Sequence, residues 1–164
     1  MNTEDKLSIE DLRGVDIFTG LYDCELEPIA KTCSQRTYQE GERCVVQGET
    51  IDELRIVNGG EVAIEMRIEI PPYTQTISIT DLTKGKVFAW SALVEPHVPT
   101  ASARCIQKAG IICIKASDLQ RIFKGRPSVE RVVMRNLVMV ISCRLRDSRA
   151  QLVRFVAEMI KQGK

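Results

Sequence analysis

Six cysteines are the residues of this 164-residue chain whose type could support redox or metal chemistry. No two of them are spaced as a C-x-x-C pair, and each lies among apolar neighbours, which is typical of small buried hydrophobes in a reducing compartment. The chain has one histidine, so no nucleophile–base pair or metal-ligand set stands at a workable spacing. We therefore predict no enzyme activity and no metal site. The cysteines are Cys24, Cys33, Cys44, Cys105, Cys113 and Cys143.

The segment LTKGKVFAWSALVEPHVPTASARC, residues 82–105, could bind an anion. A glycine turn at Gly85 leads through Phe88 into an expected short helix over residues 89–94. The first N–H groups of a helix have no partner within it and point outward with the positive end of the dipole, so they attract anions. The returning strand, Thr100 to Ala103, could offer a hydroxyl and a backbone N–H from the opposite wall. The alternative is a short covering helix and a core strand that bind nothing.

The residues expected to contact such an anion come from both walls. Small side chains in the helix would let a phosphate approach the backbone. Arg104 lies an even number of residues along the strand from Thr100 and Ser102, so the three would share a face. His97, in the loop between the walls, is expected to be solvated. The predicted ligand-binding residues are Gly85, Phe88, Ala89, Trp90, Ser91, Ala92, Thr100, Ala101, Ser102 and Arg104.

Three regions of one domain, residues 1–164, must position this segment. Residues 8–34 are predicted to be helical, because the apolar residues from Leu26 to Cys33 recur at i, i+3, i+4 and i+7. Residues 35–115 have a period of two, strongest from Val62 to Ile70, with glycines at the turns between short strands. Residues 116–162 are helical again. These patterns predict an α+β fold, mainly β: a small antiparallel β jelly roll flanked by N-terminal helices and a long C-terminal helix.

The C-terminal helix is predicted to begin at Pro127, a residue suited to the first helical position. Apolar residues recur along it at three- and four-residue steps for more than thirty residues, which is longer than one small domain can cover. We expect part of this stripe to pack on the β-unit and the rest against a second copy, giving a homodimer. The alternative is a helix that folds back on its own domain. The predicted dimer contacts are Val133, Leu137, Ile141, Leu145, Leu152 and Val156.

Composition and charge narrow the class of partner. Only 5% of the residues are aromatic, which argues against a single-stranded nucleic-acid platform, because such platforms stack bases on several rings. The net charge is +1, although residues 116–164 hold eleven Lys or Arg against four Asp or Glu. A basic helical C-terminal part could approach nucleic acid or an acidic partner. The alternative, which we favour, is that these are solvated arginines on exposed helix faces. The N-terminus MNTEDKLSIE has no apolar core and is not a secretory signal, and the longest run of large apolar residues, Leu137 to Ile141, cannot span a membrane. We expect a cytoplasmic protein without membrane contact.

Two stretches of the sequence resemble one family of regulators. In residues 38–64, YQEGERCVVQGETIDELRIVNGGEVAI, the pairs Gly41-Glu42 and Gly48-Glu49 and the strand ending in Gly60 resemble the opening strands of cyclic-nucleotide-binding domains of the catabolite-activator type. Residues 82–105 resemble the phosphate-binding cassette of the same family. The resemblance extends from about residue 10 to the long C-terminal helix. It implies the β-roll described above and a non-enzymatic sensor that signals through its C-terminal helices.

The sequence departs from the family pattern at two important side chains. Family members that bind cAMP or cGMP carry Gly-Glu after the cassette Phe, and the Glu holds the ribose hydroxyl; here Ala89 and Trp90 stand there. The family Arg that neutralises the cyclic phosphate is replaced by Pro99 or Thr100. Losing one charge-assisted contact costs roughly 1.5–3 kcal/mol, so nucleotide binding is expected to be weak or absent. In the family the long helix would close over the base, and the predicted lid residues are Ser142, Arg144 and Ser148.

Two functions follow from this resemblance. The first is a regulatory domain that senses a cyclic nucleotide, cAMP or cGMP, or another small anion. The alternative is a degenerate domain that no longer binds nucleotide and acts as a dimeric scaffold for a protein partner. Family regulators of transcription carry a helix-turn-helix domain after the long helix, and residues 1–164 contain none, so DNA binding within this chain is not expected.

Overall fold

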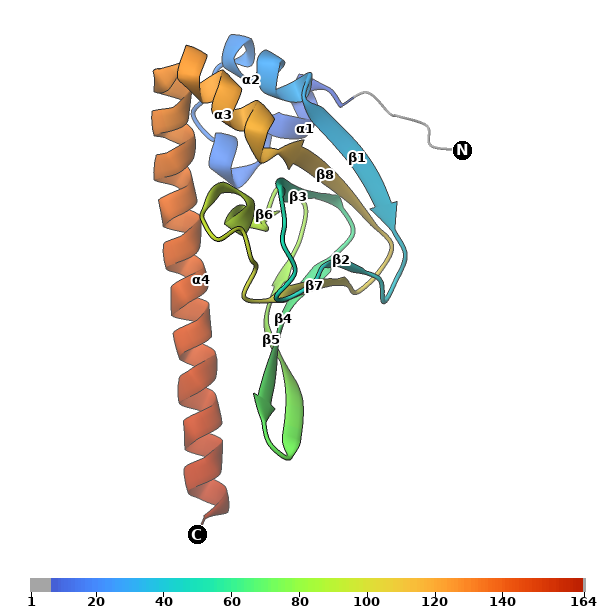
Figure 1. Cartoon of the computed structure of the whole chain (residues 1–164), viewed down its shortest axis with the longest axis vertical. Coiled ribbons are helices and arrows are strands. Elements are labelled where there is room, and N and C mark those ends of the chain that lie inside the picture. Colours follow the sequence, from blue (N-terminus) through green and yellow to red (C-terminus); the bar gives the residue numbers. More distant parts are fainter. Residues whose placement is uncertain (1–6, 164) are drawn as a thin grey trace.

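The computed structural model describes residues 7–163 and confirms the predicted α+β fold, in which the N-terminal helices lie at one end of a β-roll and one long C-terminal helix runs along its side (Figure 1). Most of the N-terminal segment that is predicted not to be a signal peptide lies outside the described residues. The elements in chain order are α1 (Ile9–Arg13), η1 (Asp16–Phe18), α2 (Asp23–Ala30), β1 (Cys33–Tyr38), β2 (Arg43–Val45), β3 (Glu53–Gly59), β4 (Val62–Ile70), β5 (Tyr73–Leu82), β6 (Val87–Phe88), η2 (Trp90–Leu93), β7 (Ser102–Cys105), β8 (Ala109–Lys115), α3 (Ala116–Gly125) and α4 (Pro127–Gln162).

The roll consists of two four-stranded sheets in which every pairing is antiparallel. The first sheet has the order β1-β8-β3-β6, and the second has the order β2-β7-β4-β5. Residues 111–114 of β8 are all buried, because Ile112 and Ile114 face the helices while Ile111 and Cys113 face the second sheet. A strand covered on both faces is therefore uniformly apolar instead of alternating.

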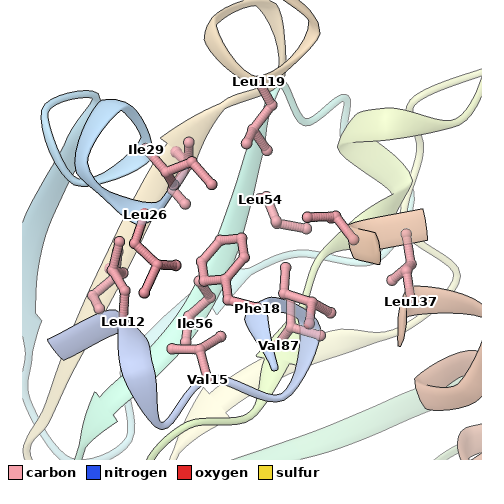
Figure 2. Packing of buried hydrophobic residues seen from close by; sticks show 14 of the residues in the cluster. Leu12, Val15, Phe18, Leu26, Ile29, Leu54, Ile56, Val87, Leu119 and Leu137 are labelled. Carbon is pink, nitrogen blue, oxygen red and sulfur yellow. The ribbon is translucent and has the colours of Figure 1, made fainter. Parts of the chain in front are cut away.

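The core between the first sheet and the helices joins distant parts of the chain. Phe18 of η1 lies against Leu54 and Ile56 of β3 and Val87 of β6, and all four are almost fully buried (Figure 2). Burying each of these side chains contributes roughly 1.5–3 kcal/mol before conformational entropy is considered. The same core contains Val133 and Leu137 of α4, so it joins β6 to that helix.

Helix α4 begins at Pro127, as predicted, and its 36 residues give it a length of about 54 Å. Its first half packs on its own chain: Val133 and Leu137 are buried in the core, and Ile141 lies against it. The Asn136 side chain donates hydrogen bonds to the carbonyls of Ile17, at 3.1 Å, and Thr19, at 2.8 Å. The second half extends beyond the roll beside the β4–β5 hairpin (Figure 1).

Three local predictions need correction. Val133 and Leu137 are buried in the core of their own chain, so the dimer contacts predicted at these two positions are wrong. The apolar stripe drifts around the helix, and its first turns face the roll. Ile141 is only partly buried, and its dimer contact stays a prediction. Cys33 is the first residue of β1 and not part of a helix, because its register opposite Ile114 continues the β1–β8 ladder.

Candidate functional site

A cavity of about 140 Å³ lies between the cassette segment, the second sheet and helix α4. Its walls come from four parts of the chain that are distant in sequence. The lining residues are Val45, Ile64, Ile79, Phe88, Ala89, Trp90, Ser91, Pro99, Thr100, Ala101, Ala103, Arg144 and Ser148. Eight of the predicted ligand-binding and lid residues are thus brought together: Phe88, Ala89, Trp90, Ser91, Thr100, Ala101, Arg144 and Ser148. Their role as ligand contacts stays a prediction.

The backbone changes direction sharply where the cassette enters the cavity wall. Phe88 ends β6, paired with Arg55 of β3, and Ala89 follows with φ +59°, in the left-handed region. An L-residue with a Cβ pays roughly 1 kcal/mol for this conformation, which a glycine would adopt without that cost. The conformation turns Ala89 and Trp90 toward the cavity.

The helix expected over residues 89–94 is a 3₁₀ turn of four residues, Trp90–Leu93. A turn this short sums few peptide dipoles, so the predicted anion site at its N-terminus is not a strong electrostatic feature of the fold. Trp90 lines the cavity and also packs against the main core, while Ala92 is buried on the other side of the turn. Ala92 is therefore a core residue and is not among the residues that line the cavity.

The loop after η2 is held by hydrogen bonds to η2 and to the segment between β2 and β3. The backbone N–H of Ile51 donates to the carbonyl of His97 at 2.8 Å, and His97 Nδ1 lies 3.3 Å from the carbonyl oxygen of Ser91. Gly48 N–H donates to the carbonyl of Pro99 at 3.0 Å. These bonds bring the wall that contains Pro99 and Thr100 opposite Ser91 across the cavity.

Gly85 has a structural role away from the cavity. Its N–H donates to the carbonyl of Val57 at 2.8 Å, and its carbonyl accepts from Asp16 N–H at 2.9 Å. At φ +87° any Cβ on this residue would overlap the carbonyl of Gly14. Gly85 therefore permits the close approach of the cassette turn to the N-terminal helices, and its prediction as a ligand contact is wrong.

Ser102 and Arg104 point to the outer face of the roll, contrary to prediction. Along β7, Ala103 and Cys105 face inward, so Ser102 and Arg104 alternate outward. Arg104 Nε donates to Glu65 at 2.9 Å, and the Ser102 hydroxyl accepts from Gln47 N–H at 3.0 Å. The prediction placed Ser102 and Arg104 on the same face as Thr100 because the spacing is even. Thr100 precedes β7, so the alternation of side chains along the strand does not extend to it.

Arg144 is the charged residue that the structure brings to the cavity. Its side chain is 17% exposed, and its Nε is buried without a hydrogen-bond partner. Asp147 Oδ2 lies 3.9 Å from Arg144 Nη1, which is close to the greatest distance at which the two groups count as an ion pair. Burial lowers the pKa of Arg144, and the more distant carboxylates of Asp147 and Asp16 oppose this shift.

The three predicted lid residues divide between two faces of α4. Arg144 and Ser148 are one turn apart and both line the cavity. Ser142 lies two residues before Arg144, about 200° around the helix, and is exposed on the outer face. Ser142 is therefore not part of the lid. Ile64 and Ile79 of the β4–β5 hairpin also line the cavity and were not predicted from the sequence. The alternation of inward-facing residues along β4 could have indicated Ile64.

Helix α4 has an exposed, largely apolar seam that runs from Val138 to Met159. Residues 138, 142, 145, 149, 152, 156 and 159 follow alternating steps of four and three, the spacing of a coiled coil. Val138, Leu145, Leu152, Val156 and Met159 in this seam are all exposed, with Leu152 61% exposed. Ser142 and Arg149 are its polar members. We call this set the α4 seam.

The thiols and acidic groups of the described chain form no metal site. Within residues 7–163, no cluster of three or more His, Cys, Asp or Glu side chains could hold a metal ion. Burial raises the pKa of the Cys33 and Cys44 thiols to about 12, which keeps both protonated. In the same part of the chain, no helix is both long enough and apolar enough to cross a lipid bilayer.

Comparison with known proteins agrees with this geometry. Residues 35–126 match the family model of the cyclic nucleotide-binding domain. The chain is 27% identical over 131 residues to glutaminase 1 of Bradyrhizobium diazoefficiens; this covers 79% of the chain but only a fifth of that relative's length. The chain therefore resembles one segment of a much longer protein.

Two solved structures share the fold. A cyclic nucleotide-binding domain from Methylobacillus flagellatus superposes with a TM-score of 0.75 at 15% identity, covering 89% of this chain and 80% of that one. The regulatory domain of Toxoplasma gondii PKA, crystallised with cAMP, gives a TM-score of 0.68 at 20% identity, covering 80% of this chain and 48% of that one. The chain belongs to the cyclic nucleotide-binding domain family, and the resemblance seen in the sequence is confirmed.

Proposed function

We propose that this chain is a non-enzymatic regulatory domain whose cavity takes a small anionic ligand, with a cyclic nucleotide as the first candidate. The observation that carries the proposal is the composition of the cavity wall. Trp90, Ser91 and Thr100 come from the roll, while Arg144 and Ser148 come from α4. A ligand in this position would contact both parts at once. It would then favour one packing of α4 over another, which is a population shift with a structural output.

Affinity for cAMP or cGMP is expected to be low. The family Glu and Arg are replaced by Trp90 and by Pro99 or Thr100. Each lost charge-assisted hydrogen bond costs about 1.5–3 kcal/mol, and every 1.4 kcal/mol is about a tenfold loss of affinity. The hydroxyls of Ser91, Thr100 and Ser148 supply weaker neutral contacts.

The output of the domain is proposed to pass through a homodimer formed by the α4 seam. Coiled-coil spacing over residues 138–159 with five exposed apolar side chains favours a second copy of the same helix as the partner. Arg149 would be a polar seam residue of the kind that specifies register. The six unpaired cysteines suit a reducing compartment, so we place the dimer in the cytoplasm.

Ligand titration tests the first part of the proposal. Trp90 is the only tryptophan and lines the cavity, so its fluorescence reports binding directly. We expect a saturable change with cAMP or cGMP at high micromolar concentration. Adding the nucleotide to the double variant Ala89→Gly, Thr100→Arg, which restores two family residues and keeps the tryptophan, should give tighter binding. If neither protein responds up to millimolar nucleotide, the cyclic-nucleotide proposal is wrong.

Sedimentation equilibrium tests the dimer. The wild-type chain should have about twice its monomer mass of 18.4 kDa. Leu152→Asp, which puts a charge in the seam, should reduce the mass to that of a monomer, since burying an unpaired charge is costly. Ala150→Asp introduces the same charge off the seam and is the matched control. A wild-type chain that is monomeric at high micromolar concentration would refute the dimer.

The degenerate scaffold is kept as a second candidate because of the cavity volume. Ligand pockets usually measure about 300–1,000 Å³, and this cavity measures about 140 Å³. A scaffold would retain the dimer and bind no nucleotide. That combination of results in the two experiments above would favour it.

A further inference from the structure

The lining of the cavity has a charge distribution that calls for an anionic ligand group at one position. Among the described residues that line it, Arg144 is the charged one. The rest are apolar or carry hydroxyls, and the apolar wall nearest the hairpin contains Ile64, Ile79 and Phe88. The only full charge in the cavity therefore comes from α4.

Arg144 has fewer acceptors than Arg55, another arginine whose side chain is mostly buried. Arg55 Nε also has no partner, but its terminal nitrogens donate to the Tyr38 hydroxyl and to Glu53 Oε2, both at 3.4 Å. The more exposed Arg36 and Arg104 donate to Glu53 and Glu65 at 2.7 Å and 2.9 Å. Arg144 has only the 3.9 Å approach of Asp147, and its buried Nε has no partner.

The acidic groups around Arg144 do not supply the missing acceptor. Asp147, one turn along α4, is half-exposed to solvent. Asp16 of η1, the packed element that faces α4, directs Oδ1 to the backbone N–H groups of Ile17, at 2.9 Å, and Val87, at 3.3 Å. Burial of the Arg144 Nε–H without an acceptor is unfavourable, so an incoming oxyanion that accepts from this group would remove that cost.

We propose that Arg144 binds the anionic group of the ligand, so that α4 holds the ligand's charge and the return strand does not. The inference rests on the proposed function, which makes this cavity the ligand site. A guanidinium presents a planar fork of donors that fits a carboxylate or phosphate oxyanion. Ser148, one turn along the same face, lies beside that group. The ligand's apolar part then lies among Ile64, Ile79 and Phe88.

Because Arg144 belongs to α4, a ligand bound to its guanidinium would contact this helix directly. The helix is fixed to the roll by buried Leu137 and by the hydrogen bonds of Asn136, and its partly buried stripe ends at Ile141. Arg144 lies in the first turn after this fixed part. An oxyanion that bridges Arg144 to Ser91 or Thr100 would tie that turn to the roll. The α4 seam continues from the same turn, so ligand occupancy would bias its position.

The test compares binding of charged and neutral ligands by arginine variants. The purified wild-type chain, residues 1–164, and its variants Arg144→Gln and Arg144→Lys are titrated with cAMP, its neutral counterpart adenosine, inorganic phosphate and benzoate. Heat of binding and Trp90 fluorescence are both recorded. We expect Arg144→Gln to weaken binding of each anion that the wild type binds by about 10- to 100-fold and Arg144→Lys to weaken it less. Adenosine binding should change little. Arg146→Gln, on an exposed arginine outside the cavity, is the matched control and should match wild type.

The outcomes separate this inference from the proposed function. If wild type and Arg144→Gln bind cAMP equally, the inference is wrong and the cyclic-nucleotide proposal stands. If wild type ignores cAMP but binds phosphate or benzoate in an Arg144-dependent way, the inference stands and the nucleotide proposal falls; the anion that binds identifies the source of the charge. If wild type binds none of the probes at millimolar concentration, both are overturned. Thermal unfolding of each variant verifies that it is folded.

Discussion

Replacing Arg144 with methionine is expected to make the ligand-free protein more stable. The Arg144 side chain is 17% exposed, its Nε has no acceptor, and its nearest carboxylate is 3.9 Å away. A buried donor without a partner costs about 1–3 kcal/mol. Methionine has a similar length, carries no polar hydrogen and suits a wall that contains Ile64, Ile79 and Phe88. Allowing for the weak attraction to Asp147, we expect the free energy of unfolding to rise by about 1–2 kcal/mol.

Urea denaturation followed by circular dichroism measures this change. At equal protein concentration, which removes any effect of dimerisation, the midpoint should increase without a change in slope. In thermal unfolding the gain corresponds to about 2–8 °C, since 1 kcal/mol shifts Tm by about 2–4 °C in a chain of this size. The exposed control Arg146→Met should stay within about 0.5 kcal/mol of wild type. If Arg144→Met lowers the free energy of unfolding by 1 kcal/mol or more, Arg144 stabilises the ligand-free protein through an ion pair, and its proposed role in ligand binding loses this support.

Three further predictions follow from the described residues. At neutral pH, a thiol reagent should modify the exposed Cys24 and Cys143 quickly. The other four cysteines should react slowly, because burial raises the pKa of their thiols. Fast modification of all six would contradict the packing. Burial also raises the pKa of Asp16, so the folded state favours the protonated carboxyl group. Protonation of Asp16 therefore adds to the free energy of unfolding at acidic pH, and this contribution is lost as the pH rises through the folded pKa. The free energy of unfolding of Asp16→Asn relative to wild type should therefore increase from pH 3 to pH 7; a flat difference would show that Asp16 titrates normally. Gly60→Ala should lower the free energy of unfolding by at least about 2 kcal/mol more than Gly41→Ala does. Both glycines have positive φ, but of the two only Gly60 has backbone atoms where a Cβ would lie. Equal urea midpoints for the two variants would refute the overlap.

Local patterns in the sequence were sufficient for the elements and the family. The alternation along Val62–Ile70 predicted β4, and Pro127 predicted the start of α4, because strand pleat and helix nucleation depend on neighbouring residues. The order of glycine turns around Gly41, Gly48 and Gly60 carried the family resemblance for the same reason. These features are independent of how the elements later pack.

The direction of individual side chains was less predictable. Arg104 was expected in the cavity because it lies an even number of residues from Thr100. Side chains alternate only within the strand, which begins after Thr100, and Arg104 pairs with Glu65 on the outer face of the roll. Ser142 and Arg144 were expected together, although about 200° of helical rotation separates them. A two-residue error is small in sequence and reverses the face on which a side chain lies.

What the sequence by itself determined is therefore the kind of domain, the positions of its strands and its one long helix. Only the tertiary structure decided which turns of α4 are covered by the roll and which remain exposed, because that depends on where η1 and β5 lie against the helix. It also decided that the cavity is small and that its charge comes from Arg144. A cavity is bounded by residues far apart in sequence, so its volume and its unpaired groups exist only after the chain has folded.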